Sequence, residues 1–225
     1  MSHSEINTDD FLAAVEEKVT RRSGEFHSWK DAFHLLSRSL RAPHKVGSLW
    51  PSSRYLARYM LQGVPLKSGD VVVEYGPGTG PFTHFLKYYV EQGVSYLGIE
   101  QDRVLYEKLR RRFPQLRFHH GSAEEVKQLL PYYQLEKPSL VISGLPFANM
   151  PAAIQEAILQ VTQEVLRDDG FFRTFTYLFS SISPRALQFK KIVLNKFLQQ
   201  HQSKIVFSNL PPARVLSFSH PRREE

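Results

Sequence analysis

The sequence lacks cysteine and long apolar runs. None of its 225 residues is Cys, which excludes disulfide bonds and thiolate metal sites and is compatible with a reducing cytoplasm. It contains no stretch of about 18 apolar residues, and its N-terminus is polar rather than charged and then apolar. We therefore expect a protein that neither spans a membrane nor carries an export signal.

Acidic residues are outnumbered by basic ones. The chain carries 29 Lys and Arg against 22 Asp and Glu, a formal net charge of +7. This excess favours an anionic partner, either nucleic acid or an acidic membrane surface, and composition does not choose between them. With 42% hydrophobic residues, the chain is long enough for one well-packed α/β domain with a small extension.

A glycine-rich turn follows the strongest strand signal. Val71-Val72-Val73 predicts a buried strand that ends at Glu74, and Gly76, Gly78 and Gly80 follow. Glycine allows a tight turn and lets a ligand approach the backbone. A dinucleotide site has the spacing G-x-G-x-x-G. The G-x-G-x-G spacing found here suits a ligand with a cationic amino acid, whose charge Glu74 would oppose; a plain structural loop is the alternative.

A second acid follows the next predicted strand, over 94–99. Glu100 comes 24 residues after Gly76, where a carboxylate can hold both hydroxyl groups of a ribose. The alternative is that Glu100 and Asp102 both cap the helix predicted over 103–113. We assign Asp102 to the cap and Glu100 to the ribose.

A third strand, predicted over 116–119, ends near two more candidates. Ser122 and Ala123 are placed to contact an adenine ring, although a helix over 123–130 can instead begin here. His119 and His120 have no partner at metal-ligand spacing, so we expect no metal site.

A fourth strand, predicted over 139–142, ends in Ser143-Gly144-Leu145-Pro146-Phe147. At the carboxyl edge of the sheet, a rigid proline turn of this kind is expected to point backbone carbonyls and an aromatic face toward the group that is transferred. Further helices are predicted over 82–92, 151–166 and 184–200, and further strands over 171–179, 204–209 and 213–219. Repeated β-α units indicate a parallel sheet, and the final pair of strands brings in an antiparallel strand.

The N-terminal region concentrates the basic residues. A helix predicted over 25–41 has an apolar stripe that includes Trp29 and Phe33. Nine Lys or Arg residues lie between Lys18 and Arg58, against two acids. Such a helix can lie in a lipid interface, although a helix packed on the core with a solvated basic face is the alternative. We favour the membrane because the charge excess is concentrated here.

Five stretches of the chain occur together: Val46-Gly47-Ser48-Leu49-Trp50-Pro51-Ser52-Ser53-Arg54-Tyr55-Leu56-Ala57, Glu74-Tyr75-Gly76-Pro77-Gly78-Thr79-Gly80, Val141-Ile142-Ser143-Gly144-Leu145-Pro146-Phe147, Phe175-Thr176-Tyr177 and Asn209-Leu210-Pro211-Pro212-Ala213. Taken together, these five stretches are similar to the corresponding stretches of the bacterial PmtA-type phospholipid N-methyltransferases. The resemblance extends from about residue 20 to the C-terminus. The glycine motif is shared by many methyltransferases and is unspecific. The pair of motifs Pro-Ser-Ser-Arg (51–54) and Ser-Gly-Leu-Pro (143–146) is more specific for this family.

The resemblance implies a Rossmann-like class I methyltransferase fold, with a seven-stranded, mostly parallel sheet, helices on both faces and N-terminal amphipathic helices. It implies transfer of methyl groups from S-adenosylmethionine, which leaves S-adenosylhomocysteine, to the amine of phosphatidylethanolamine in up to three rounds toward phosphatidylcholine. It also implies a cytoplasmic enzyme, peripheral on the inner leaflet of the cytoplasmic membrane. We expect a helical extension over 1–64 that serves as a membrane-docking unit or substrate lid, and an S-adenosylmethionine-binding methyltransferase domain over 65–225.

The resemblance also distributes roles among the candidate residues. The cofactor would be held by Ser53, Glu74, Tyr75, Gly76, Gly78, Thr79, Gly80, Glu100, Gln101, Ser122, Ala123 and Ser143. The amine would lie against Ser143, Gly144, Leu145, Pro146, Phe147 and Tyr177. The lipid surface would meet Trp29, Phe33, Lys45, Arg54 and Arg58, although any of these cations can equally be solvated.

Two roles in catalysis stay open. Phe147 and Tyr177 would stabilise the methylated, cationic product by cation–π contact, worth about 0.5–2 kcal/mol, unless they only pack in the core. The proton acceptor is Tyr177, His120 or water.

Two other functions are weighed against this one. The rRNA adenine N6-dimethyltransferases carry Asn-Leu/Ile-Pro-Tyr/Phe after the fourth strand, where this chain has Gly144. An aromatic amine needs that side-chain oxygen because its lone pair is delocalised into the ring, whereas an alkylamine needs mainly room and alignment. Gly144 therefore argues against a base substrate. The weaker alternative is a non-enzymatic basic module that binds membrane or RNA and does not bind S-adenosylmethionine.

Overall fold

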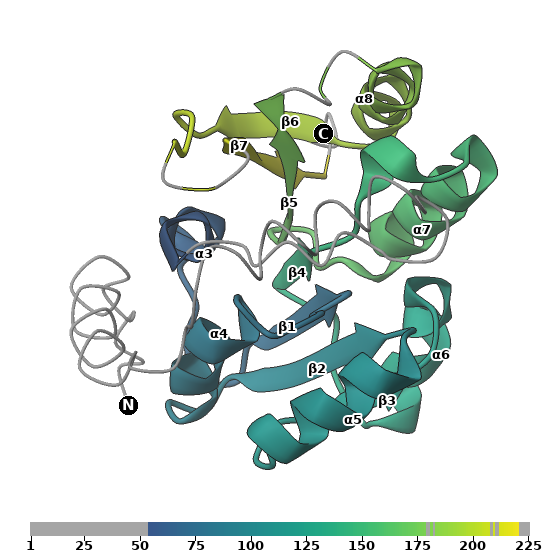
Figure 1. Cartoon of the computed structure of the whole chain (residues 1–225). Helices are drawn as coiled ribbons and strands as arrows, with labels where there is room; N and C mark the ends of the chain where they lie inside the picture. Colours follow the sequence, from purple (N-terminus) through teal and green to yellow (C-terminus); the bar gives the residue numbers. More distant parts are fainter. Residues whose placement is uncertain (1–53, 179–180, 182, 208, 210–211, 221–225) are drawn as a thin grey trace.

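Figure 1 shows the computed structural model of the chain, which describes residues 54–178, 181, 183–207, 209 and 212–220. The strands of this part are β1 (Val71–Tyr75), β2 (Ser95–Glu100), β3 (Phe118–His120), β4 (Leu140–Ser143), β5 (Phe171–Tyr177), β6 (Leu198–Gln202) and β7 (Ala213–Ser219). They form one seven-stranded sheet in the order β3-β2-β1-β4-β5-β7-β6. β1 to β5 pair in parallel, and β7 is antiparallel to β5 and β6.

Helices cover both faces of the sheet. Those of the described part are α3 (Arg54–Leu61), α4 (Thr83–Val90), α5 (Arg103–Arg112), α6 (Val126–Tyr132), α7 (Ala152–Val165) and α8 (Pro184–Lys196), with short 3₁₀ helices over Ala123–Glu125 and Phe147–Asn149. α3, α4 and α5 pack on one face, and α6, α7 and α8 pack on the other. This three-layer arrangement confirms the predicted fold class.

The run of valines in β1 fits a strand that is covered on both sides. Val72 packs toward α3, α4 and α5, whereas Val71 and Val73 pack toward α6, α7 and α8, because successive side chains of a strand point to opposite faces. Parallel strands of this kind read as continuous apolar runs. The strand order reverses between β1 and β4, so their carboxyl ends form the crevice where open α/β sheets bind ligands.

The C-terminal elements differ from the sequence prediction. The helix predicted over 184–200 ends at Lys196, and Phe197 is already extended, with φ −135° and ψ 152°. β6 follows, while the strand predicted over 204–209 is wrong, because Val206 makes only an isolated bridge with Ala213. All five residues of β6 are exposed, so no apolar alternation marked this strand in the sequence.

The described end of the predicted N-terminal unit, residues 54–64, is part of the core. Leu56, Ala57, Met60 and Leu61 of α3 are fully buried, and α3 contacts β5 and β7. The helices predicted before α3 lie outside the described residues, and the boundary after residue 64 stays a prediction. None of the helices in the described ranges has both the length and the apolar character needed to cross a bilayer.

A buried arginine fastens α3 to the sheet. Arg173 in β5 is 6% exposed, and its Nη1 donates to the carbonyl oxygens of Met60 (3.2 Å) and Gln62 (2.7 Å) at the C-terminal end of α3. Its Nε donates to Ser217 Oγ in β7 (3.1 Å). Burial lowers the pKa of Arg173 to about 10. The partial negative charge of a helix C-terminus favours a cation at this place.

Candidate functional site

The loop after β1 packs its glycines against two neighbouring elements. Gly76, Gly78 and Gly80 have φ of +60°, +61° and +83°, which L side chains rarely adopt. A Cβ on Gly76 would lie 2.7 Å from Leu145 Cδ2, and one on Gly80 would lie 2.7 Å from a ring carbon of Phe113. A Cβ on Gly78 would come no closer than 3.9 Å to another atom. The middle of the loop is thus the part that a ligand can approach.

Glu74 is fully buried at the end of β1. Its Oε2 accepts hydrogen bonds from Thr83 Oγ1 in α4 (2.8 Å) and from the Tyr96 hydroxyl in β2 (2.6 Å). Its Oε1 is buried and has no hydrogen-bond partner among the described residues. Burial raises the pKa of Glu74 to about 7, against the two hydrogen bonds, which lower it. An unpaired buried carboxylate oxygen fits a cationic group of a ligand.

Glu100 joins the tip of β2 to the glycine loop. It is 7% exposed, and its Oε2 accepts from the backbone N–H of Gly78 (2.8 Å) and its Oε1 from that of Asp102 (3.0 Å). Burial raises its pKa. A carboxylate has about four acceptor positions, so both oxygens retain lone pairs for further donors, and the predicted contact with a ribose stays a prediction. Asp102 accepts from the Leu105 N–H (2.8 Å), which confirms the predicted cap of α5.

Ser122 begins the short 3₁₀ helix over Ala123–Glu125. Its Oγ accepts from the Glu124 N–H (3.3 Å), and its own N–H donates to Glu125 Oε1 (2.8 Å), which makes a capping box. The Ser122 N–H is therefore used within the chain rather than left for an adenine. The S-x-x-E spacing of Ser122 and Glu125 was the signal for this cap.

Gln101 and Thr79 are the exposed members of the predicted cofactor set. The Gln101 carbonyl oxygen lies 3.2 Å from His120 Nε2. The Thr79 carbonyl oxygen accepts from Arg112 Nη1 (3.0 Å). Tyr75, in contrast to these two exposed residues, is fully buried, and its hydroxyl accepts a hydrogen bond from Thr162 Oγ1 in α7 (3.2 Å). Only the backbone of Tyr75 thus faces the loop.

The turn after β4 lies directly against the glycine loop. The Gly144 N–H donates to the Tyr75 carbonyl oxygen (2.8 Å). A Cβ on Gly144 would lie 2.6 Å from the Gly76 carbonyl oxygen, so this backbone has room only for glycine. Ser143 is fully buried, and its Oγ accepts from the Leu145 N–H (3.2 Å).

The turn and the end of β5 share one cavity of about 420 Å³. Its walls include Gly144, Leu145, Pro146 and Phe147 of the turn and Tyr177 of β5, and α8, β6 and β7 complete it. The structure therefore brings together every residue predicted to face the amine except the buried Ser143. Their roles toward a substrate stay predictions.

The two aromatic residues of this set differ in packing. Phe147 is 4% exposed, and its ring stacks on Phe189 with centroids 4.5 Å apart and meets Phe172 edge-on at 6.3 Å. Core packing thus accounts for Phe147, because Phe189 covers one face of its ring. Tyr177 is half-buried and meets Phe175 edge-on at 5.3 Å.

The residues predicted to meet lipid lie mainly before the described part. Trp29, Phe33, Lys45 and the predicted cofactor residue Ser53 lie outside the described residues. α3 begins at Arg54, and Arg58 lies in its last turn, partly exposed.

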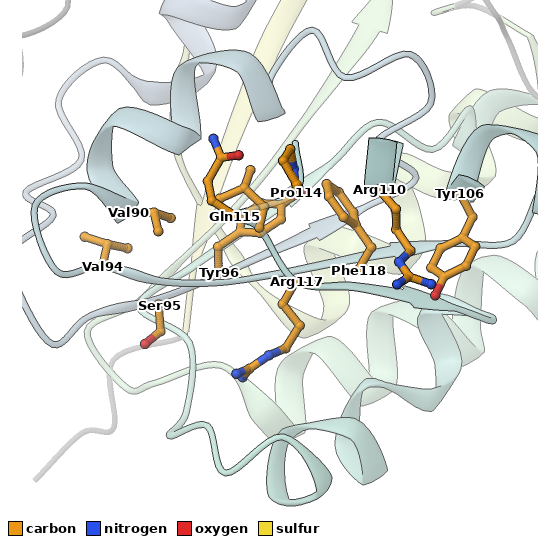
Figure 2. A pocket seen from close by; sticks show the side chains of 11 residues that line it. Val90, Val94, Ser95, Tyr96, Tyr106, Arg110, Pro114, Gln115, Arg117 and Phe118 are labelled. Carbon is orange, nitrogen blue, oxygen red and sulfur yellow. The ribbon is translucent and has the colours of Figure 1, made fainter. Parts of the chain in front are cut away.

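A wider depression of about 710 Å³ lies at the β3 edge of the sheet. Figure 2 shows Arg110 beside the ring of Tyr106 there, with Arg117 and Phe118 at the strand. None of the described residues that line it belongs to the predicted site.

The predicted strand-end histidines have partners within the fold. His119 Nε2 lies 3.3 Å from Glu125 Oε2, and His119 Nδ1 lies 3.2 Å from the Tyr133 hydroxyl. Within the described ranges, no cluster of three or more His, Asp or Glu side chains is arranged to hold a metal ion.

No protein-family model matches the chain. An ornithine lipid N-methyltransferase from Singulisphaera acidiphila is 29% identical over 191 residues, which cover 82% of this chain and 93% of that protein. A ribosomal RNA small subunit methyltransferase A from Synechococcus sp. is 37% identical over 89 residues, which cover only 39% of this chain and 29% of that protein.

The fold has close counterparts among solved structures. Fibrillarin from Aeropyrum pernix, solved with natively bound S-adenosylmethionine, matches with a TM-score of 0.55 and 11% identity, over 67% of this chain and 66% of that one. This likeness concerns the fold, and the bound S-adenosylmethionine belongs to that structure. Glu74 and Glu100 lie at the carboxyl ends of β1 and β2 beside the glycine loop, and their roles toward a cofactor stay predictions. The chain has the fold of the class I S-adenosylmethionine-dependent methyltransferases.

Proposed function

We propose that the chain is an N-methyltransferase that methylates the amine of a membrane lipid head group at the membrane surface. The first candidate is phosphatidylethanolamine, methylated in successive rounds toward phosphatidylcholine. The observation that carries the proposal is the Gly144 turn, which lies against the glycine loop and presents no side chain there. An alkylamine needs mainly room and alignment at such a place.

In this proposal, one group of residues binds S-adenosylmethionine and a second group binds the lipid amine. S-adenosylmethionine, when bound, supplies an electrophilic methyl group on a positively charged sulfur. Glu74 opposes the positive charge at its amino acid end, and Glu100 holds its ribose. The turn from Gly144 to Phe147 and the end of β5 hold the neutral amine in line with the methyl group, so that most of the acceleration is positioning.

Ornithine lipid is the second candidate substrate. The relative named for this activity aligns over most of both chains, which supports a lipid amine as the acceptor. Ornithine lipid and phosphatidylethanolamine both carry a primary alkylamine, so the chemistry required of the turn is the same for both.

An rRNA adenine remains the alternative from a different class. The matches to rRNA methyltransferases are partial, and an Asn in place of Gly144 would bring a Cβ to 2.6 Å from the Gly76 carbonyl oxygen. The side-chain oxygen that an aromatic amine needs therefore does not fit on this backbone. This steric fact favours an alkylamine.

The membrane part of the proposal rests on the basic N-terminal segment and places the enzyme on the inner leaflet of the cytoplasmic membrane. Deletion of residues 20–41 should abolish binding to anionic vesicles and leave methylation of a small soluble amine intact. Full vesicle binding by the truncated protein would refute this docking role.

The deciding experiment is a competition for labelled methyl groups. S-adenosylmethionine with a labelled methyl group is offered together with phosphatidylethanolamine vesicles, ornithine lipid vesicles and unmodified rRNA. Label in a lipid supports the proposal, and chromatography of its mono-, di- and trimethylated forms counts the rounds. Label in rRNA alone refutes the proposal.

A further inference from the structure

The cavity beside the Gly144 turn combines apolar walls with positive charge. Phe189 of α8 and Leu216 and Phe218 of β7 line it, together with the cations Arg214 in β7 and Lys190 in α8. None of the described residues that line it is Asp or Glu. Arg214 is half-buried, so the apolar walls reduce the screening of its charge, whereas Lys190 is exposed at the rim.

Arg214 reaches the cavity from the sheet. It pairs with Thr176 in β5, the residue before Tyr177, and alternation puts it on the same face as Leu216, toward α8. Its Nε is buried and has no hydrogen-bond partner among the described residues. A buried N–H without an acceptor loses the hydrogen bond that water would give it, which is unfavourable. A bound anion would remove this cost.

We infer that Arg214 and Lys190 bind the anionic group of a zwitterionic lipid head group, while its amine extends to the turn at Gly144. This inference rests on the proposed function. Arginine pairs in two-pronged fashion with phosphodiester or carboxylate oxygens, and lysine adds a point charge. Phosphatidylethanolamine has a phosphodiester and ornithine lipid a carboxylate, each separated from the amine by a short carbon chain.

The same cations favour the reactive form of the amine. Only the deprotonated amine has the lone pair that attacks the methyl carbon, and nearby positive charges lower the pKa of an amine. The two side chains thus hold one end of the head group and disfavour protonation of the other.

The test compares two acceptors, phosphatidylethanolamine in micelles and dodecylamine, which has an amine and an alkyl chain but no anion. Arg214→Gln should raise the KM for phosphatidylethanolamine about tenfold or more. It should lower kcat/KM for dodecylamine by a smaller factor, because only the effect of the cation on the amine pKa is lost there, and leave the Kd for S-adenosylmethionine unchanged. Lys190→Met should act in the same direction, and Arg214→Lys should recover part of the loss. Lys191→Met, the exposed neighbour that does not line the cavity, is the matched control. Equal losses on both acceptors, or none, would overturn the inference.

A binding measurement separates this inference from the proposed function. The NMR resonance of the Arg214 Nε–Hε group, assigned by its loss in Arg214→Gln, is followed during titration with glycerophosphoethanolamine and with N-acetylornithine. A saturable shift supports the anion site and shows whether it takes the phosphodiester or the carboxylate, even if no lipid is methylated. The absence of a shift with both compounds overturns the anion site, whatever the enzyme methylates.

Discussion

Arg173 Nη1 in β5 lies 2.7 Å from the carbonyl oxygen of Gln62, immediately after α3. No carboxylate appears among the groups that Arg173 bonds to in the described part of the chain; its acceptors are carbonyl oxygens and the Ser217 hydroxyl. Because α3 has only eight residues, its position depends on packing and on this contact rather than on helix propensity.

Arg173→Met should lower the free energy of unfolding by about 3 kcal/mol, because the carbonyl oxygens at the end of α3 lose their donor. Urea unfolding measures this. Arg111→Met, which removes an 80% exposed guanidinium of α5, should change stability by no more than about 0.5 kcal/mol. Arg173→Lys keeps the charge without the planar fork and should recover only part of the loss. Equal effects of Arg173→Met and Arg111→Met would contradict the role of this contact.

Glu74 should make the stability depend on pH. Its pKa is about 7 when folded and 4.5 as an isolated group, so between these values the folded protein keeps a proton that the unfolded chain has lost. Stability should therefore fall as pH rises from about 4.5 to 7, by about 3 kcal/mol from this group. Glu74→Gln should match the wild type at the acid end and exceed it above pH 7 in urea unfolding. The exposed Glu91→Gln is the control, and parallel curves for all three proteins would show that Glu74 is not the cause.

Substitution can separate the two roles given to the acids after β2. Glu100→Ala should raise the Kd for S-adenosylmethionine at least about tenfold, because the ribose hydroxyls lose their acceptor. Asp102→Ala should lower stability by about 1 kcal/mol through loss of the α5 cap and leave the Kd unchanged. Calorimetric titration measures the Kd of both variants, and urea unfolding measures their stability. An unchanged Kd for Glu100→Ala would contradict the ribose contact and would mean that Glu100 has only a structural role.

Gly144→Ala should displace the glycine loop, because its Cβ meets the Gly76 backbone oxygen at 2.6 Å. We expect a loss of about 1–3 kcal/mol in stability together with weaker cofactor binding. Gly121→Ala is the control, since its Cβ would meet the side chains of Glu125 and His119, which can move. Gly144→Asn should gain no activity on rRNA; methylation of rRNA by this variant would show that the missing side chain alone sets the substrate.

The central strands could be predicted to within one or two residues. β1, β2, β4 and β7 contain apolar residues that the core requires, and turn residues bound them, so local pattern and tertiary packing agree. β6 could not be found this way, because its exposed residues carry no pattern and its place comes from pairing with β7.

The arginines of β5 and β7 were missed for a related reason. Arg173 alternates with Phe171 and Phe175 on one face of β5, so a charge within an apolar period was visible in the sequence. Its acceptors come from α3, more than 100 residues earlier in the chain, and no local pattern supplies them. Arg214 was likewise unremarkable until β7 placed it over the cavity. The candidate site was predictable where motifs lie at strand ends, and not where side chains converge from distant elements.

Because burial raises the pKa of Glu74 to about 7, this carboxyl is partly protonated at neutral pH. If the cationic end of S-adenosylmethionine lies beside it, binding favours the ionised form and expels a fraction of a proton into the solvent. The heat of cofactor binding at pH 7 should then differ between phosphate and Tris, because these buffers take up a proton with different enthalpies, and Glu74→Gln should abolish the difference. Cofactor loading in this protein would be an acid-releasing event, and the loading equilibrium would follow the acidity of the compartment in which the enzyme works.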